Sequence, residues 1–359
     1  MGIVVKSEGK EFRHWSMVNI DLMLDTVAST FELAGLRGSA PELFEPLGYK
    51  DVEIWIIDEN KGINEKLLTG TIMNVGLSKE KKPKLDTISG FSKPGILEQC
   101  AMPKSLYPLQ WNNTSMATIA RDIVRAFNLT LEIDEGAVDK ANEKFEKVEC
   151  DEQESVKSFL SKIGQEKGIT VAHNNLGDLY LYRILNVIPA TSRISENDYV
   201  VSFSTQPNGQ GMHSEVTVRR DGDIDQDDVE GTDFSQNLNQ SYTLQSPFVK
   251  NKFLPFTRIM KKGDLGSISD YAETLLAREA VNMPVTFTKQ GWDFNGRIVR
   301  AGFFLELEAP SILVRDTKFV VNSMNFNKDA KGLETLTATC ILPCAYTGKL
   351  PSSSPYINV

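Results

Sequence analysis

The residues with the clearest potential for chemistry form an acidic run, DGDIDQDDVEG, at positions 221–231. Its alternating aspartates are candidate metal ligands: Asp221, Asp223, Asp225 and Asp227. This spacing is typical of calcium loops, in which carboxylate oxygens converge on a hard cation. The rest of the calcium pattern is missing, because Gln226 stands at the position of the turn glycine and Thr232 at that of the bidentate glutamate. Crowded carboxylates repel one another and stay hydrated, so we expect a solvated acidic loop, with metal binding as the alternative.

Histidine supplies most general bases near neutral pH, and this chain has only His14, His173 and His213. None of them lies in a catalytic motif, and the sequence contains no HExxH, GxSxG, Walker A or GxGxxG pattern. His14 adjoins Trp15 in an expected strand and His173 precedes an expected hairpin turn, so we predict structural or surface roles. No pair of carboxylates that could cleave a glycan is singled out among the 48 acidic residues.

The cysteines and tryptophans predict packing rather than chemistry. The chain has no CxxC pair, and its cysteines are Cys100, Cys150, Cys340 and Cys344. Cys340 and Cys344 lie four residues apart on an expected strand that Pro343 interrupts, so buried, reduced thiols are expected. Trp111 and Trp292 adjoin turn signals, which favours core or interface packing.

The overall composition indicates a folded, water-soluble protein of several domains. The chain has 359 residues, 41% of them hydrophobic and 24% charged, and a formal net charge of -9. It shows no signal peptide and no apolar run that could span a membrane, so we expect it to fold in a cytoplasm without membrane insertion. The negative charge argues against a broad nucleic-acid-binding surface, although acidic walls would let DNA slide past without sticking.

Hydrophobic periodicity predicts the elements that position these residues. Residues 1–90 alternate apolar and polar positions, as in VNIDLMLDTVASTFELAG and VEIWIID, which predicts short strands of an antiparallel barrel or sandwich. Between 91 and 185 the period becomes helical in TSMATIARDIVRAFNL behind Thr114, and a second helix starts near Asp151 and ends at Gly168. A hairpin with an Asn-Asn-Leu-Gly turn follows, so this segment is predicted to be a small α/β unit.

The remaining chain is again strand-rich. Residues 186–250 are polar and rich in turns, and their strand-like pieces are expected to return to the first sheet across the acidic loop. Residues 251–350 read as strands with one helix capped by Ser269 or Asp270, and the tail 351–359 is expected to be unpacked. The predicted fold class is α+β, mainly β, with a small inserted α/β domain.

Three stretches resemble, in the same order, the Mu-type baseplate hub family of contractile-tailed phages, which is related in fold to the upper part of type VI secretion spikes. The first is SGFSKPGILEQCAMP followed by TSMATIARDIVRAFNLTLEID, and the second is ESVKSFLSKIGQEKGITVAHNNLGDLYLYR. The third runs from SDYAETLLAREA through VTFTKQGW and IVRAGFFLELEAP to FVVNSMNFNKDAKGLETLTATCILPCAY. Together they cover well over half of the chain, and residues 205–250 match no part of the family.

The resemblance implies two similar antiparallel β-barrels, one from residues 1–90 with the return segment 186–250 and one from 251–350. Residues 91–185 would be inserted in the first barrel. It also implies a homotrimer, in which two similar barrels per chain give six quasi-equivalent units, so that a three-fold central spike can meet a six-fold tail tube. Baseplate wedge components and the tape-measure protein are further implied partners, and DNA passes through without specific binding.

These observations predict a non-enzymatic structural protein of the virion: the hub of a phage-tail baseplate, assembled in the host cytoplasm, with an acid-lined channel and no cofactor. The alternative is a tail-associated glycan-binding or metal-dependent hydrolase module that uses the acidic run. Such a module would need converging carboxylates in a concave site.

Overall fold

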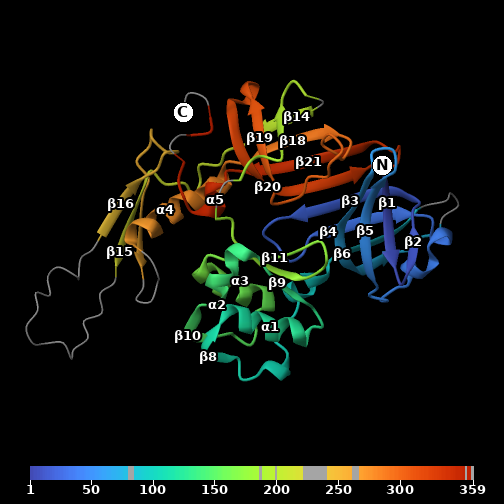
Figure 1. Cartoon of the computed structure of the whole chain (residues 1–359), viewed down its shortest axis with the longest axis horizontal. Coiled ribbons are helices and arrows are strands. Elements are labelled where there is room, and N and C mark those ends of the chain that lie inside the picture. Colours follow the sequence, from blue (N-terminus) through green and yellow to red (C-terminus); the bar gives the residue numbers. More distant parts are fainter. Residues whose placement is uncertain are drawn as a thin grey trace, which may run out of the picture.

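The computed structural model describes residues 1–79, 85–185, 188–198, 200–220, 241–260, 267–351 and 354–356. Within these ranges the chain is mainly β, with one large, largely antiparallel sheet and three small ones. Figure 1 shows an α/β unit beside the large sheet and a small sheet with one helix at the far side of the molecule. No helix in the described ranges is long and apolar enough to cross a membrane.

The first half of the large sheet is a series of antiparallel strands that bury alternate residues. Val18, Ile20 and Leu22 point into the core from one strand, as the period-two pattern predicted. The elements are β1 (Gly2–Ser7), β2 (Lys10–Phe12), β3 (Trp15–Met23), β4 (Thr30–Gly35), η1 (Arg37–Ser39), η2 (Pro41–Phe44), β5 (Asp51–Asp58), β6 (Ile63–Gly76) and β7 (Asp86–Ser92).

The α/β unit, called the insert below, follows β7. Its elements are η3 (Lys93–Glu98), η4 (Lys104–Leu106), β8 (Gln110–Ser115), α1 (Met116–Ala126), β9 (Leu131–Ile133), η5 (Glu135–Ala137), α2 (Val138–Asn142), β10 (Lys144–Glu149), α3 (Val156–Lys167), β11 (Thr170–His173) and β12 (Leu179–Tyr182). Apolar residues at helical spacing bury one face of α1 and one face of α3 in a core of the insert's own.

Both predicted helix starts in the insert are displaced, the first by one residue and the second by about one turn. Ser115 caps α1, because its Oγ accepts the N–H of Thr118, whereas the predicted cap Thr114 lies in β8. Strand pairing thus extends to the residue before the helix. The cap of α3 is Ser155, and the helix ends as predicted at Gly168, whose φ of 65° is a left-handed conformation that glycine adopts without strain.

The second half of the large sheet is built from the strands that follow the insert. Its elements are β13 (Ser192–Ser195), β14 (Val200–Thr205), η6 (Glu279–Asn282), β18 (Val285–Gln290), β19 (Phe304–Ala309), η7 (Pro310–Ile312), β20 (Val314–Lys328), β21 (Glu334–Ile341) and α5 (Cys344–Thr347). β13 and β14 come from the segment predicted to return to the first sheet; they lie in the same large sheet as the N-terminal strands, but their partners are β19 and β18 and not strands of the first half. The rings of Phe203 and Phe287 pack at 5.7 Å, so burial favours this pairing.

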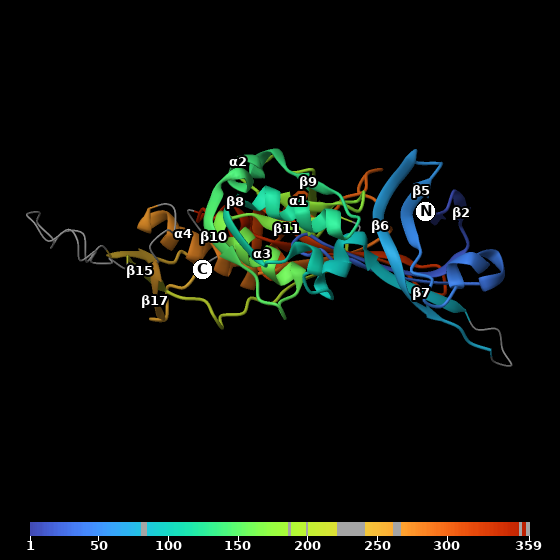
Figure 2. The ribbon, with the colours of Figure 1, turned by 90° about the horizontal axis from the view of Figure 1, so that it is seen from below.

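A small separate sheet lies between β14 and β18 in the sequence. It contains β15 (Glu215–Arg220), β16 (Ser241–Gln245) and β17 (Pro255–Met260), and α4 (Ile268–Arg278) covers one face. Ser267 caps α4 by accepting the N–H of Asp270, so the cap lies ahead of both predicted positions. Figure 2 shows this sheet and the strands of the first half at opposite ends of the molecule.

The two halves of the large sheet repeat one topology. The order β3-β4-β7-β6-β5 in the first half corresponds to β14-β18-β21-β20-β19 in the second, with strands in the same sequence order. Each half has one long strand, β6 in the first and β20 in the second. Its N-terminal part pairs with one neighbour and its C-terminal part, the late part, pairs with another. In both strands a bulge lies in the late part, in the pairing with β7 or with β21. The two halves join where β20 pairs with β3. The described strands form an open path and not a closed barrel.

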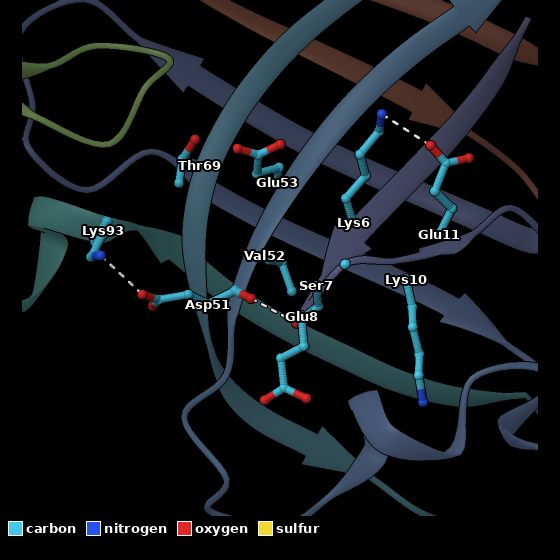
Figure 3. Close-up of a pocket in the computed structure, with 11 residues that line it drawn as sticks. Lys6, Ser7, Glu8, Lys10, Glu11, Asp51, Val52, Glu53, Thr69 and Lys93 are labelled. Carbon is cyan, nitrogen blue, oxygen red and sulfur yellow. Dashed lines mark hydrogen bonds and ion pairs between the residues drawn. The ribbon is translucent and has the colours of Figure 1, made fainter.

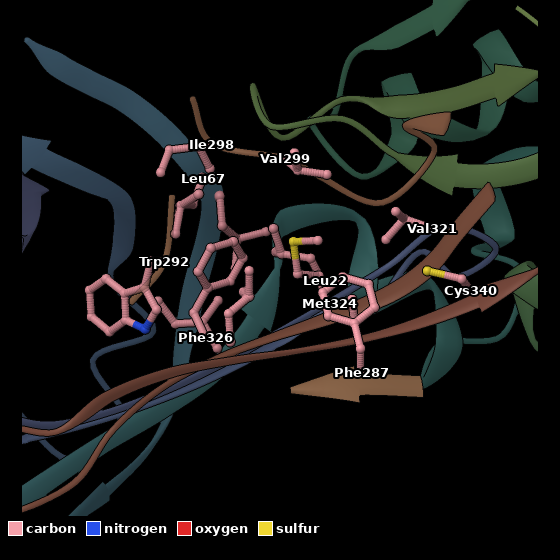
Figure 4. Close-up of a cluster of buried hydrophobic side chains, with 14 of the residues drawn as sticks. Leu22, Leu67, Phe287, Trp292, Ile298, Val299, Val321, Met324, Phe326 and Cys340 are labelled. Atoms are coloured by element: carbon pink, nitrogen blue, oxygen red, sulfur yellow. The ribbon is translucent and has the colours of Figure 1, made fainter. Parts of the chain in front are cut away.

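One hydrophobic core serves both halves. Figure 4 shows side chains of β3, β6, β18 and β20 meeting in it, among them Leu22, Leu67, Phe287 and Phe326. Trp292 is fully buried there, and its indole N–H donates to two backbone carbonyl oxygens. This one core buries the same face of the sheet in both halves. The opposite face is therefore also common to the two halves.

Part of the C-terminal tail is packed. The carbonyl of Pro355 accepts the N–H of Arg315, and the hydroxyl of Tyr356 lies 2.8 Å from the Oγ1 of Thr205. Tyr356 is buried in the shared core, so the prediction of an unpacked tail is wrong for the described residues 354–356.

Candidate functional site

Across seven neighbouring strands of the large sheet, from β14 through β18, β21, β20, β3 and β4 to β7, the outward face is a continuous surface of small polar side chains. We call it the polar face, and it consists of Ser202 and Ser204 of β14, Thr286 and Thr288 of β18, Thr335, Thr337 and Thr339 of β21, Ser323, Asn325 and Asn327 of β20, Asn19 and Asp21 of β3, Thr30 and Glu32 of β4, and Thr87 and Ser89 of β7. These residues alternate with core residues along each strand and are partners in register across strands. Three larger apolar residues interrupt them: Met17, Met23 and Phe91.

Hydrogen bonds tie neighbouring side chains of the polar face together. The hydroxyls of Thr288 and Thr337 lie 3.0 Å apart across β18 and β21. At the joint between the halves, the amide of Asn325 donates to Asn19 and to Asp21, each at 2.7 Å. Short side chains that bond to one another present a low, hydrated surface.

The polar face carries negative charge without compensation. Its ionisable members are Asp21 and Glu32, and it contains no lysine or arginine. Neither carboxylate forms an ion pair with any described residue, and within the same part of the chain the one hydrogen bond to the Asp21 carboxylate comes from the neutral amide of Asn325. An acidic ligand such as a phosphate backbone would therefore be repelled and not held.

Charged residues elsewhere in the first half neutralise one another. The hollow in Figure 3, beside β1 and β5, has a volume of about 550 Å³ and is lined by lysines and carboxylates. Lys6 lies 3.0 Å from Glu11, and Lys93 lies 3.0 Å from Asp51. The lysines and carboxylates that line the hollow therefore offset one another's charge.

A second hollow of about 520 Å³ lies on the polar face next to the end of β6. Two bulky residues of the η2–β5 connection line it in left-handed conformations: Leu47 has a φ of 57° and Tyr49 a φ of 46°. These residues are 74% and 54% exposed. Residues without glycine's freedom rarely adopt this conformation, so strain is stored in holding two apolar side chains outward beside Met73 and Asn74.

The aspartates of the predicted metal loop, Asp221, Asp223, Asp225 and Asp227, lie outside the described residues. In the part of the chain that is described, no three histidine, cysteine, aspartate or glutamate side chains gather as a metal site would require.

The three histidines are far apart in the fold and serve different contacts. His14 is exposed, and His213 stacks on Phe256 while its Nδ1 lies 2.6 Å from Glu279. His173 joins the insert to the first half: its Nε2 lies 2.6 Å from the Oγ of Ser29, and its Nδ1 lies 2.9 Å from a backbone carbonyl oxygen.

These distances identify the tautomer that neutral His173 adopts. A carbonyl oxygen only accepts, so Nδ1 carries the proton and Nε2 accepts the hydroxyl hydrogen of Ser29. Ser29 is fully buried, and its Oγ also accepts the N–H of Met23. Burial lowers the pKa of His173 below its ordinary value of 6.5, since desolvation disfavours the imidazolium. This serine and histidine pair has the geometry of a nucleophile with a base, but a substrate cannot reach the buried hydroxyl.

The cysteines and tryptophans occupy packing positions. Cys340 lies in β21 and Cys344 in α5, so they do not share a strand as predicted, because the chain leaves the sheet before Pro343. Burial raises the pKa of the Cys344 thiol to about 12, which keeps it protonated. Trp292 is in the shared core, and Trp111 stacks on Phe159 in the insert.

Sequence reasoning missed the polar face, although a signal for it was present. VTFTKQ, LETLTATC and SMNFNK each place threonine, asparagine or serine at every second position of an expected strand. That pattern shows a small polar face on each strand. It does not show that these faces are adjacent, because strand order is a property of the fold.

Comparison with known proteins identifies the relatives of this arrangement. Residues 95–183 match the family model of the second domain of gp44-like baseplate hub proteins. The baseplate hub protein gp44 of Escherichia phage Mu is 23% identical over 226 residues, which are 60% of this chain and 54% of the Mu protein. The match therefore spans about half the length of that relative.

Two solved structures share the fold over almost their whole length. The 43 kDa tail protein of prophage MuSo2 from Shewanella oneidensis superposes with a TM-score of 0.74 at 16% identity, covering 96% of this chain and all of that one. The tail protein from Neisseria meningitidis MC58 gives a TM-score of 0.74 at 18% identity, covering 97% and 98%. The resemblance predicted from the sequence is thus confirmed: this chain is similar to the Mu-type baseplate hub proteins of phage tails, and its insert matches the second domain of the gp44-like hub family.

Proposed function

We propose that this protein is the structural hub of a contractile phage-tail baseplate, located in the virion and assembled in the host cytoplasm. Three copies form a ring whose channel is lined by the polar face. The observation that carries this proposal is the topological repeat within one continuous sheet. The hub is non-enzymatic in this account, because its work is to hold other components in register.

The repeat predicts how neighbouring chains meet. Within the chain, the late part of β20 pairs on one side with β21 and on the other with β3 of the first half. The equivalent late part of β6 pairs with β7, and no described strand pairs with its other side. The equivalent of β3 is β14, whose outer side is also without a partner among the described strands. Pairing β6 of one chain with β14 of the next repeats the internal joint.

The register of this contact follows from the bulges. Asn74 and Ser323 are the first paired residues after the bulge in β6 and in β20, so they are equivalent positions. Asn327 follows Ser323 by the same number of residues as Ser78 follows Asn74, so Asn327 and Ser78 are equivalent. Following the strand register across the sheet leads from Asn74 to Asn19 and from Ser323 to Ser204, so Asn19 and Ser204 are equivalent as well. The internal pair Asn327 and Asn19 therefore corresponds to Ser78 of one chain and Ser204 of the next.

One observation supports a partner at this edge. The exposed Leu47 and Tyr49 lie at the same end of β6. Apolar side chains held outward at the cost of backbone strain are normally in contact with something, and a neighbouring chain would supply that contact.

The ring would act as an adaptor between symmetries. Each chain supplies two similar sheets, so three chains supply six, which is what a six-fold tail tube on one side and a three-fold central spike on the other require. The division of the chain that we propose for this role is a first barrel near 1–90, the insert 91–185, a second barrel formed by β13, β14 and the strands of the large sheet within 251–350, and the tail 351–359. In the ring, neighbouring sheets rather than one chain close the barrel.

The polar face suits the wall of a channel for DNA and the tape-measure protein. The side chains of the polar face are short and are hydrogen-bonded to one another, so they offer few free groups for a passing chain to bind. Asp21 and Glu32 repel phosphate. The insert and the small sheet, which lie on different sides of the large sheet in Figure 1, are the surfaces that we assign to spike and wedge components.

Cysteine cross-linking tests the ring. A Ser78→Cys, Ser204→Cys double variant should form covalent trimers on mild oxidation, because directly opposed residues of antiparallel strands bring Cβ atoms within disulfide reach. Each single variant should stay uncrosslinked, and pairing Ser78→Cys with Thr243→Cys on the small sheet is the matched control. Native mass measurement of the unmodified protein gives the subunit number. A ring with no 78–204 cross-link, or a chain that stays monomeric in the assembled baseplate, would show the proposal to be wrong.

A further inference from the structure

The insert carries a hollow that plays no part in the proposed ring contact. It has a volume of about 510 Å³ and lies between the η4–β8 connection and α1. This size is within the usual range for small-ligand sites. Figure 1 shows β8 and α1 on the side of the insert that faces away from the large sheet, so the hollow is open to solvent in a ring built as above.

Two aromatic side chains line the hollow. Tyr107 is 46% exposed and is free to present its ring to a ligand. Trp111 is partly exposed, and its indole stacks on the buried ring of Phe159 with centroids 5.3 Å apart and planes tilted by 28°. This contact holds the indole plane in place, so the hollow has a rigid aromatic wall before any ligand arrives.

An acid and a base on successive turns of α1 form the polar side of the hollow. The Nη1 of Arg125 lies 3.7 Å from the Oδ1 of Asp122, which is longer than a hydrogen bond. Neither side chain makes a hydrogen bond with any described residue, and the Arg125 side chain is 76% exposed. The guanidinium donors and carboxylate acceptors are therefore both available at the rim.

This combination selects one class of ligand. An anion such as phosphate would meet Asp122, and a cation would meet Arg125, so the paired charges favour a neutral molecule. Adjacent donors and acceptors suit hydroxyl groups, which do both, and the aromatic rings suit an apolar face. A hexopyranose ring has hydroxyls at its edge and C–H groups on its faces. We propose that the hollow binds neutral oligosaccharides, with Tyr107 and Trp111 against sugar faces and Asp122 and Arg125 bonding to hydroxyls.

The test is binding of the full-length protein to an array of neutral hexose and N-acetylhexosamine oligosaccharides, with chitotetraose and maltotetraose also titrated in solution. Binding to at least one array member is expected, with a shift of the Trp111 indole N–H signal in NMR spectra. Arg125→Ala should weaken binding about tenfold or more, because hydrogen bonds to a charged group are lost. Tyr107→Ala should weaken it as well. Both residues are exposed, so folding should be unaffected.

Arg121→Ala is the matched control, since Arg121 is an exposed arginine of the same helix outside the hollow. It should bind like the unchanged protein. Absence of binding across the whole array would overturn the proposal, and so would binding that is equally strong in the Tyr107, Arg125 and Arg121 variants. Trimer formation and the 78–204 cross-link are unaffected by either result, so failure here leaves the proposed ring standing.

Discussion

The joint between His173 and Ser29 should make the stability of this protein depend on pH. The imidazole is neutral in the folded chain, and its pKa is held below the ordinary 6.5 by burial. No described carboxylate lies close enough to stabilise the imidazolium, and its hydrogen-bond partners are a backbone carbonyl and the hydroxyl of Ser29. In the unfolded chain the same group is solvated and binds a proton near pH 6.5.

The direction and size of the effect follow from this difference. Below pH 6.5 the unfolded state binds more protons than the folded state, so stability is complete above that pH and is lost as the pH falls toward the folded pKa. One proton costs at most about 1.4 kcal/mol per pH unit in that window. Protonation also turns Nε2 into a donor, so Ser29 can no longer donate to it.

The assay is urea unfolding of the full chain at several pH values between 7.5 and 5, followed by a probe in the insert and one in the large sheet. His173→Gln keeps a polar side chain but cannot titrate, so its free energy of unfolding should be lower than that of the unchanged protein at pH 7.5. The gap should narrow by up to about 1.4 kcal/mol for each pH unit below 6.5. A gap that is constant over this range would refute the assignment of a neutral His173 in the folded chain. The control His14→Gln changes an exposed histidine and should alter neither value nor slope.

Two further predictions concern the large sheet. The double change Asp21→Asn, Glu32→Gln removes two negative charges per chain from the polar face, so phage carrying it should eject DNA severalfold more slowly in a fluorescence ejection assay, whereas an unchanged rate would count against an acid-lined channel. Gly90→Ala should destabilise the fold by several kcal/mol in denaturant unfolding, because the added Cβ would meet a backbone carbonyl oxygen at 2.0 Å. Gly209→Ala meets nothing within 4 Å and is the control, and equal midpoints for the two variants would contradict this packing argument.

The sequence by itself determined which residues face inward and where most elements lie. The alternation in β3 and β4, the apolar stripe of α1 and the end of α3 at Gly168 were predicted, because side-chain periodicity and a left-handed cap depend on neighbouring residues alone. The insert was predicted from a change of period, and the resemblance to phage hub proteins from the order of three short stretches.

Only the tertiary structure decided which strands are neighbours. Periodicity in β13 and β14 says which side chains are buried but not which strands they pair with, and in the fold they pair with β19 and β18 and not with a strand of the first half. The same limit explains the caps: pairing of β8 with β10 extends the strand to Ser115, so the cap of α1 falls after Thr114. The polar face is the clearest case, because Asp21 and Asn325 are 304 positions apart in the sequence and become hydrogen-bonded neighbours only when β3 joins β20.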